Sequence, residues 1–180
     1  MIEPWKIIGR LGNQMFMIAK TYADMRSGAI PDIYCQDDMY FREYETEVKQ
    51  LFGSDIVPIN QVAIHVRRGD YVGNKFYVDL TETTYYDEAM KHFPSENFLV
   101  FSDDIEFCKE YFVGEQFEFC EETDPVKSLN LMAGCKGIIM ANSSFSWWAA
   151  YLCKGKVIAP KKWYSDGVPR TTTLDQWIKV

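Results

Sequence analysis

The stretch VAIHVRRGDY (residues 62–71) joins a short apolar run to two adjacent arginines and a glycine. Residues 62–66 have the length and composition of a buried strand, and the polar residues that follow them are typical of a loop. A segment of helical character, 84–93, comes next. The pattern therefore predicts a strand, a loop and a helix, with both arginines at the carboxyl end of the strand.

The same order recurs through the rest of the chain. The apolar runs that predict strands lie at 97–101, 116–120, 137–141 and 156–159, and the segments that predict helices lie at 105–112, 125–135 and 145–153. Short strands that alternate with helices are typical of βαβ units. We therefore expect an α/β fold, a Rossmann-like parallel sheet with helices on both faces, whose ligands bind beyond the carboxyl ends of the strands.

The first 60 residues are less regular than the rest. Residues 5–8 predict a strand, 9–13 a tight turn and 14–26 a helix, whereas 32–58 are aromatic, acidic and weakly periodic. A compact lobe and a cap on the same sheet both fit this region. We place a domain boundary after residue 60, so that a reduced N-terminal lobe precedes a Rossmann-like domain at 61–180.

Composition and charge narrow the classes of function. The chain has 180 residues, of which 47% are hydrophobic and 25% are charged, as is typical of a globular domain. Its net charge of −7 argues against non-specific nucleic-acid binding, which depends on clustered positive charge. An acidic protein with a few concentrated arginines and lysines suits a small anionic ligand better.

Cysteine usage and hydropathy indicate the compartment. The five cysteines include no C-x-x-C pair, and the chain has two histidines, which argues against a disulfide framework, a zinc site and a His-rich metal site. No apolar run reaches the ~18 residues of a membrane helix, and residues 1–4 lack the basic start of a signal peptide. We therefore expect a cytoplasmic protein with reduced cysteines and no transmembrane segment.

The arginine motif HVRRGDY (residues 65–71) is the first candidate site. Two guanidinium groups at the end of a strand can donate bidentate hydrogen bonds to a phosphate. Alternation along the strand places His65 and Arg67 on one face, while Arg68 is already turning into the loop. The alternative is a solvated arginine pair that is bridged to Asp70.

Two further motifs lie where a predicted strand is followed by a helix. In GRLGNQ (residues 9–14) the glycines let the backbone approach a ligand and the helix N-terminus favours an anion, although a plain strand–turn–helix junction explains the motif equally well. In NSSFSWW (residues 142–148) the amide and hydroxyl groups cap the helix, and the same groups can hold a phosphate.

The fourth motif, FSDD (residues 101–104), also follows a predicted strand. Asp103 and Asp104 can accept hydrogen bonds from a base edge or a ribose, and an Asp N-cap on the helix that starts at 105 explains them equally well. The chain contains no Asp-x-Asp motif of the kind that binds a metal ion at a diphosphate. Arginines and helix N-termini are then the groups expected to stabilise a departing pyrophosphate.

Taken together, these motifs resemble the alpha-1,2-fucosyltransferase family, glycosyltransferase family 11, in residues and in order. The matching segments are GRLGNQMF (9–16), HVRRGDY (65–71), FSDD (101–104), NSSFSWWAA (142–150) and VIAPKKW (157–163). The resemblance is close over residues 5–20 and roughly 62–163. Family members carry a much longer segment between the first two motifs, whereas here Gln14 and His65 are separated by 50 residues. The chain therefore looks like a shortened member with a reduced acceptor-side lobe and a complete donor-binding domain.

The resemblance also implies an activity. It implies an inverting, metal-independent transferase of GT-B type that moves L-fucose from GDP-beta-L-fucose to a hydroxyl of a galactose-containing glycan, with alpha-1,2 linkage and without a cofactor. By similarity, Arg67 holds the pyrophosphate and Arg68 supports it. No general base is assigned in this way; Asp70 is a candidate, and its place beside the arginine pair favours an orienting role. The donor-binding residues implied in the same way are Asn13, His65, Arg67, Asp103, Asp104, Asn142, Ser143, Ser144 and Phe145.

Two other functions remain open at this point. One is a non-catalytic protein that binds nucleotides or GDP-sugars and has lost the acceptor domain. The other is a transferase that uses a different nucleotide sugar on the same scaffold. The aromatic residues within 34–52 fit an acceptor groove, a dimer contact or a small core, so the sequence leaves the oligomeric state open, and peripheral contact with a membrane is compatible with it.

Overall fold

The computed structural model describes residues 9–27, 36–168 and 173–180. Its centre is a parallel sheet of six strands in the order β3-β2-β1-β4-β5-β6. The strands are β1 Ile59–Val66, β2 Phe98–Ser102, β3 Phe117–Phe119, β4 Cys135–Ile139, β5 Lys156–Ala159 and β6 Ile178–Lys179. This is the strand order of the Rossmann fold, in which the direction of winding reverses between β1 and β4 and leaves a crevice at their carboxyl ends.

Six α-helices and four short 3-10 helices connect and cover the strands of the described chain. The α-helices are α1 Leu11–Ser27, α2 Glu45–Gly53, α3 Tyr85–Met90, α4 Ile105–Tyr111, α5 Pro125–Gly134 and α6 Ser144–Leu152. The 3-10 helices are η2 Asp38–Tyr40, η3 Arg42–Tyr44, η4 Gly69–Tyr71 and η5 Leu80–Glu82. Within the described ranges, no helix has the length and apolar character needed to span a membrane.

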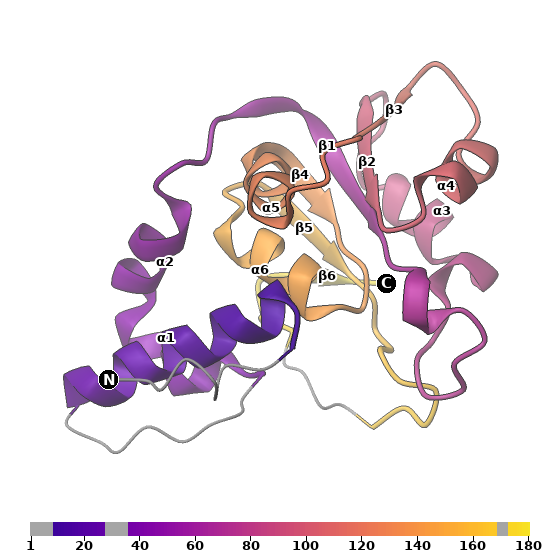
Figure 1. The fold of residues 1–180 in the computed structure, drawn as a ribbon. Coiled ribbons are helices and arrows are strands. Elements are labelled where there is room, and N and C mark those ends of the chain that lie inside the picture. Colours follow the sequence, from indigo (N-terminus) through magenta and orange to yellow (C-terminus); the bar gives the residue numbers. More distant parts are fainter. Residues whose placement is uncertain (1–8, 28–35, 169–172) are drawn as a thin grey trace.

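The sheet separates two hydrophobic cores. Side chains of α3 and α4 pack with Val62, Ile64 and Val66 of β1 on one face, while those of α1, α2, α5 and α6 pack with Ala63 on the other. Figure 1 shows α3 and α4 on the side of the sheet opposite to α1, α2 and α6. The alternation along β1 follows from the two-residue period of a strand, and it points His65 to the same face as Ala63.

The alternating pattern read from the sequence is confirmed, and so is the α/β class with its parallel sheet. The expected strand 137–141 is displaced, because β4 begins at Cys135 directly after α5 ends. Gly134 makes this sharp junction possible, since a Cβ at that position would collide with the Val57 carbonyl oxygen. The expected strand at 5–8 lies outside the described residues, and the two-residue strand β6 was not anticipated.

The N-terminal helix begins earlier than its expected start. We expected a turn at 9–13 and a helix from 14, but α1 starts at Leu11, so that Gly12 and Asn13 belong to its first turn. The helix packs against α6 through Phe16, whose ring centre lies 4.5 Å from that of Trp147 and 5.1 Å from that of Trp148. Helices α1 and α2 therefore share one core with α6, which fits a cap on the sheet; the domain boundary after residue 60 stays a prediction.

Candidate ligand-binding site

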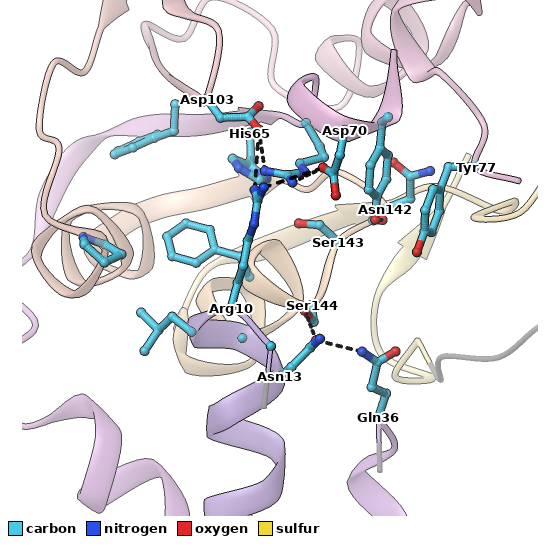
Figure 2. A pocket seen from close by; sticks show the side chains of 18 of the residues that line it. Arg10, Asn13, Gln36, His65, Asp70, Tyr77, Asp103, Asn142, Ser143 and Ser144 are labelled. Atoms are coloured by element: carbon cyan, nitrogen blue, oxygen red, sulfur yellow. Dashed lines mark hydrogen bonds and ion pairs between the residues drawn. The ribbon is translucent and has the colours of Figure 1, made fainter. Parts of the chain in front are cut away.

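A cavity of about 1060 Å³ lies at the carboxyl ends of β1 and β4, where the winding of the sheet reverses. Its lining comes from the loops after β1, β2, β3, β4 and β5, from the start of α1 and from residues 36–40. Small-molecule sites in proteins usually have volumes of about 300–1,000 Å³, so this cavity accommodates a ligand as large as a nucleotide sugar. Figure 2 shows its central part.

Two helix N-termini meet at this cavity. A Cβ on Gly12 would lie 2.5 Å from the backbone nitrogen of Phe145, so only glycine allows the first turn of α1 to approach α6 so closely. Ser143 caps α6, because its Oγ accepts a hydrogen bond from the backbone N–H of Ser146 at 3.2 Å. The N–H groups of Ser144 and Phe145 belong to the first turn, which has no intrahelical acceptors. The positive ends of both helix dipoles therefore favour an anion here.

A polar contact joins the two helices at the same place. The Ser144 hydroxyl donates to Asn13 Oδ1 at 2.6 Å, and Gln36 Nε2 donates to the same oxygen at 2.7 Å (Figure 2). Asn13 and Ser144 thus line the cavity together, as the sequence motifs suggested. Gln36 was not identified from the sequence, because it lies in a weakly periodic segment with no motif around it.

Arg10, Arg67, Asp70 and Asp103 form what we call the cavity cluster, of which Figure 2 labels Arg10, Asp70 and Asp103. The Arg67 guanidinium forms ion pairs with both Asp70 and Asp103. Arg10 approaches the same carboxylates, with nitrogen–oxygen distances of 4.0 Å to Asp70 and 3.9 Å to Asp103. The Arg10 side chain is 69% exposed and that of Asp70 is 60% exposed, whereas that of Arg67 is 12% exposed.

Asp103 is the fixed carboxylate of this cluster. Its Oδ1 accepts a hydrogen bond from the backbone N–H of Arg68 at 2.9 Å, and its other oxygen pairs with Arg67. Gly69 has a φ of +31°, and a Cβ there would collide with the Asp103 carboxylate. The glycine of the HVRRGDY motif therefore lets the loop after β1 close against the loop after β2.

Arg68 and Asp104 do not line the cavity. Arg68 Nη1 lies 3.2 Å from both Asp79 Oδ2 and Thr81 Oγ1, and its guanidinium carbon lies 3.6 Å from the centre of the Phe107 ring. Asp104 caps α4 by accepting from the Phe107 N–H, and one of its oxygens lies 3.7 Å from Arg68 Nε. We call these five residues the Arg68 cluster. The N-cap explanation therefore holds for Asp104, and Arg68 stabilises the loop from outside the cavity.

His65 lies on the cavity side of β1 and is buried. The pKa of His65 is lowered to about 4, chiefly by burial; Asp103 opposes the shift and Arg67 adds to it. The ring is therefore neutral near pH 7. Its Nδ1 has no hydrogen-bond partner among the described residues, and the ring centre lies 5.6 Å from that of Phe145.

Asn142 lines the cavity but uses its amide group to hold the surrounding chain. Its Nδ2 donates to the carbonyl oxygens of Val78 and Trp163, both at 2.9 Å, and its own carbonyl accepts from the Tyr71 hydroxyl at 3.0 Å. Asn142 therefore joins the loop after β1 to the segment after β5. This is a structural role that its place in the NSSFSWW motif did not reveal.

Polar residues line the cavity on the β3 side. Glu122 and Thr123 lie between β3 and α5, Ser128 lies in α5, and Ser102 is the last residue of β2. The sequence did not identify this segment as part of a site, because polar residues of this kind are common at helix N-termini. Among the described residues, no group of three or more His, Cys, Asp or Glu side chains is arranged to hold a metal ion.

Comparison with known proteins agrees with this geometry. Glycosyl transferase family 11 matches residues 30–180. The alpha-1,2-colitosyltransferase of Escherichia coli is 35% identical over 73% of this chain and 54% of that protein. The O-antigen biosynthesis glycosyltransferase WbnK of Escherichia coli is 29% identical over 67% of this chain and 45% of that protein. The human galactoside alpha-(1,2)-fucosyltransferase 1 is 31% identical over 56% of this chain and 31% of that protein.

The chain thus spans about half the length of the bacterial relatives it matches. The family match covers the whole sheet and every residue of the cavity except those of α1 and the turn before it. This protein belongs to glycosyl transferase family 11.

Proposed function

We propose that this protein binds GDP-beta-L-fucose in the cavity and transfers L-fucose, with inversion and without a metal ion, to a hydroxyl of a galactose-containing glycan through an alpha-1,2 linkage. The observation that carries the proposal is the convergence of two helix N-termini and two arginines, Arg10 and Arg67, on one cavity. Such a site supplies N–H donors and positive charge where a diphosphate would sit. The relatives, which include an alpha-1,2-colitosyltransferase and an alpha-(1,2)-fucosyltransferase, support the sugar and the linkage.

The cavity cluster suits a diphosphate that enters and leaves. In the free protein the two arginines are balanced by Asp70 and Asp103. Asp103 is anchored to the Arg68 N–H, whereas Asp70 lies on an exposed 3-10 turn. On binding, the diphosphate replaces Asp70 as the partner of Arg67 and Arg10, so the aspartate acts as a placeholder for the anion.

The same groups serve the chemical step. The acceptor hydroxyl oxygen forms a bond to C1 of fucose as the bond between C1 and the β-phosphate oxygen breaks. The electron pair of the broken bond stays on the departing diphosphate, and the proton of the hydroxyl is released to water. Arg67, Arg10 and the first-turn N–H groups of α6 stabilise this growing negative charge without a metal ion. In the free protein, Asp70 orients the Arg67 guanidinium through their ion pair.

The two sides of the cavity suggest how the nucleoside binds. The neutral His65 and the fixed Asp103 lie on the floor between β1 and β2, and the polar residues around the start of α5 offer further hydrogen bonds. We assign the guanosine to this β3 side. Asp104 is left out of the donor site, because its carboxylate caps α4.

A turnover assay tests the proposal. The purified chain is incubated with GDP-fucose and a panel of galactosides, and released GDP and fucosylated product are quantified. We expect turnover by the wild-type protein and none by Arg67→Ala, while Arg26→Ala, which removes an exposed arginine at the end of α1, keeps the wild-type rate. In parallel, GDP should raise the melting temperature and ATP should not.

Each failure of this assay has a distinct meaning. Binding of GDP-fucose without transfer or hydrolysis would identify a non-catalytic GDP-sugar-binding protein. Stronger binding of GDP-mannose or UDP-galactose than of GDP-fucose would overturn the choice of donor. The absence of any response to GDP would refute the proposed site.

A further inference from the structure

Three tyrosines border the cavity on the β5 side of the arginines: Tyr71, Tyr77 and Tyr164, which we call the tyrosine wall. Tyr71 and Tyr77 stack with ring centres 3.9 Å apart and an interplanar angle of 6°. The ring centre of Tyr164 lies 5.6 Å from that of Tyr77. In Figure 2, Tyr77 stands at the cavity beside Asn142 and Asp70.

The wall is held in place before any ligand binds. The backbone N–H of Val78 donates to the Trp163 carbonyl at 3.1 Å, and the N–H of Ser165 donates to the Phe76 carbonyl at 2.9 Å. Asn142 ties both segments to the start of α6 through its two amide hydrogen bonds. Rings fixed in this way lose little conformational freedom when a ligand packs against them, which is the basis of preorganised binding.

The position of the wall relative to Arg67 decides what it contacts. The Arg67 guanidinium carbon lies 5.3 Å from the centre of the Tyr71 ring. In a nucleotide sugar, the sugar is bonded directly to the terminal phosphate, so a phosphate held by Arg67 places the sugar within reach of the neighbouring side chains. The nucleoside extends the other way, toward the polar residues that follow β3.

The chemistry of the wall suits a sugar with an apolar face. Aromatic rings pack against C–H groups, and tyrosine adds a hydroxyl that forms hydrogen bonds at the rim. Burial raises the pKa of Tyr77, so its hydroxyl stays protonated and able to donate near neutral pH, whereas the Tyr71 hydroxyl already donates to the Asn142 carbonyl. A 6-deoxyhexose such as L-fucose presents a methyl group where other hexoses carry a hydroxymethyl group.

We propose that the tyrosine wall is the subsite for the sugar of the donor and that Tyr77 supplies the contact that favours a 6-deoxyhexose. This proposal rests on the proposed function, because it assumes that the cavity holds a GDP-sugar. It adds a specificity-determining residue, Tyr77, that comes from a segment outside the four motifs. Tyr71 and Tyr164 position the Tyr77 ring.

Calorimetric titration with GDP and with GDP-fucose tests the wall. The sugar's contribution is the ratio of the two dissociation constants, measured for the wild type, Tyr77→Ala and Tyr77→Phe. We expect GDP-fucose to bind the wild type more tightly than GDP does. Tyr77→Ala should weaken GDP-fucose about three- to tenfold, the range expected for one aromatic contact, and leave GDP unchanged. Tyr77→Phe should keep most of the ratio, because it keeps the ring.

Controls separate this proposal from the proposed function. Tyr22→Ala, on α1 and outside the cavity, should behave as the wild type, and melting curves verify that each variant folds. If the wild type fails to bind GDP, the proposed function fails, and the wall assignment fails with it. Two outcomes would overturn only the wall assignment. One is that GDP and GDP-fucose bind the wild type with equal dissociation constants, and the other is that Tyr77→Ala leaves their ratio unchanged. A raised KM for the glycan acceptor with an unchanged ratio would assign the wall to the acceptor instead.

The preference for a 6-deoxyhexose has its own measurement. GDP-L-galactose, which differs from GDP-fucose only by a 6-hydroxyl, competes with GDP-fucose for the wild type and for Tyr77→Ala. We expect the wild type to prefer GDP-fucose and the variant to lose that preference. Equal selectivity in the two proteins would refute the role of Tyr77 in choosing the sugar.

Discussion

Two adjacent arginines lie in two different environments in this protein. Arg67 points into an open cavity, where it meets Asp70 and Asp103 beside two helix N-termini. Arg68 packs over Phe107 outside the cavity and bonds to Asp79 and Thr81. Both guanidiniums have acidic partners, so the presence of ion pairs does not distinguish them. The difference is that only the cavity cluster adjoins open space and donors that an incoming anion can use.

The contrast shows that adjacent residues of one motif can have different roles. β1 ends at Val66, and the backbone turns at Arg68, so that consecutive side chains leave on opposite sides of the chain. One arginine is available to a ligand, and the other fixes the loop that presents the first. Their roles can therefore be separated experimentally.

The largest expected effect is a difference in GDP affinity between variants of Arg67 and of Arg68. Arg67→Ala removes the guanidinium that the proposed function assigns to the diphosphate, and it should weaken GDP binding by about 4 kcal/mol, roughly a thousandfold in Kd. Arg68→Ala should lower the melting temperature but leave the Kd for GDP near the wild-type value. Calorimetry and thermal unfolding of both variants measure these effects. Equal losses of affinity would show that the two clusters act as one site.

The second test varies the pH. A histidine, His65, lies beside the cavity cluster, whereas the Arg68 cluster contains none. The pKa of His65 is about 4 in the folded protein, whereas an unfolded histidine has a pKa near 6.5. The unfolded state therefore takes up a proton first as the pH falls. The stability linked to neutral His65 is complete above about pH 6.5 and is lost as the pH falls to about 4, a change on the order of 3 kcal/mol.

Denaturant unfolding between pH 7 and pH 4 measures this loss. His65→Gln is the matched variant, because it keeps a neutral polar side chain of similar size at the cavity floor. We expect its stability to fall less steeply than that of the wild type over this range. Parallel curves for the two proteins would contradict the assignment to His65.

A third and smaller effect tests the close approach of α1 to α6. This junction borders the cavity cluster but not the Arg68 cluster. Gly12→Ala places a methyl group against the backbone of Ser144 and Phe145, and it should cost about 1–3 kcal/mol of stability and weaken GDP binding as α1 moves away from α6. Gly53→Ala on α2 is the control, since its Cβ would make an ordinary contact 3.5 Å from Ile56. If Gly12→Ala matches Gly53→Ala in stability and in GDP affinity, the close approach is not required.

Much of the fold could be read from local patterns. The strands β1, β2, β3 and β5 and the helices α3 to α6 fall within a few residues of their expected positions, because apolar periodicity and capping residues are local signals. Asp104 and Ser143 cap their helices as the N-cap explanations required. β6 was missed because two residues carry no periodicity, and the start of α1 was misplaced because Gly12 reads as a turn residue.

The candidate site could be read only in part. Arg67, Asp70, Asp103, His65 and the residues of α1 and α6 line one cavity, as the ends of neighbouring parallel strands should. Arg68 and Asp104 lie outside it, because a one-residue change in direction at the end of a strand moves a side chain to the other side. Arg10 and Tyr77 gained a place in the site only through contacts between distant segments.

The sequence by itself determined the parallel α/β sheet and the edge at which the cavity lies, since strand periodicity and the polar motifs after each strand are local properties. The tertiary structure alone decided which of two neighbouring arginines faces that cavity, that Asn142 holds the chain, and that tyrosines from two segments form one wall. These outcomes depend on how distant segments pack against one another. Packing is set by the fit of side chains in three dimensions, such as the missing Cβ of Gly12 against α6, and no short stretch of sequence contains that information.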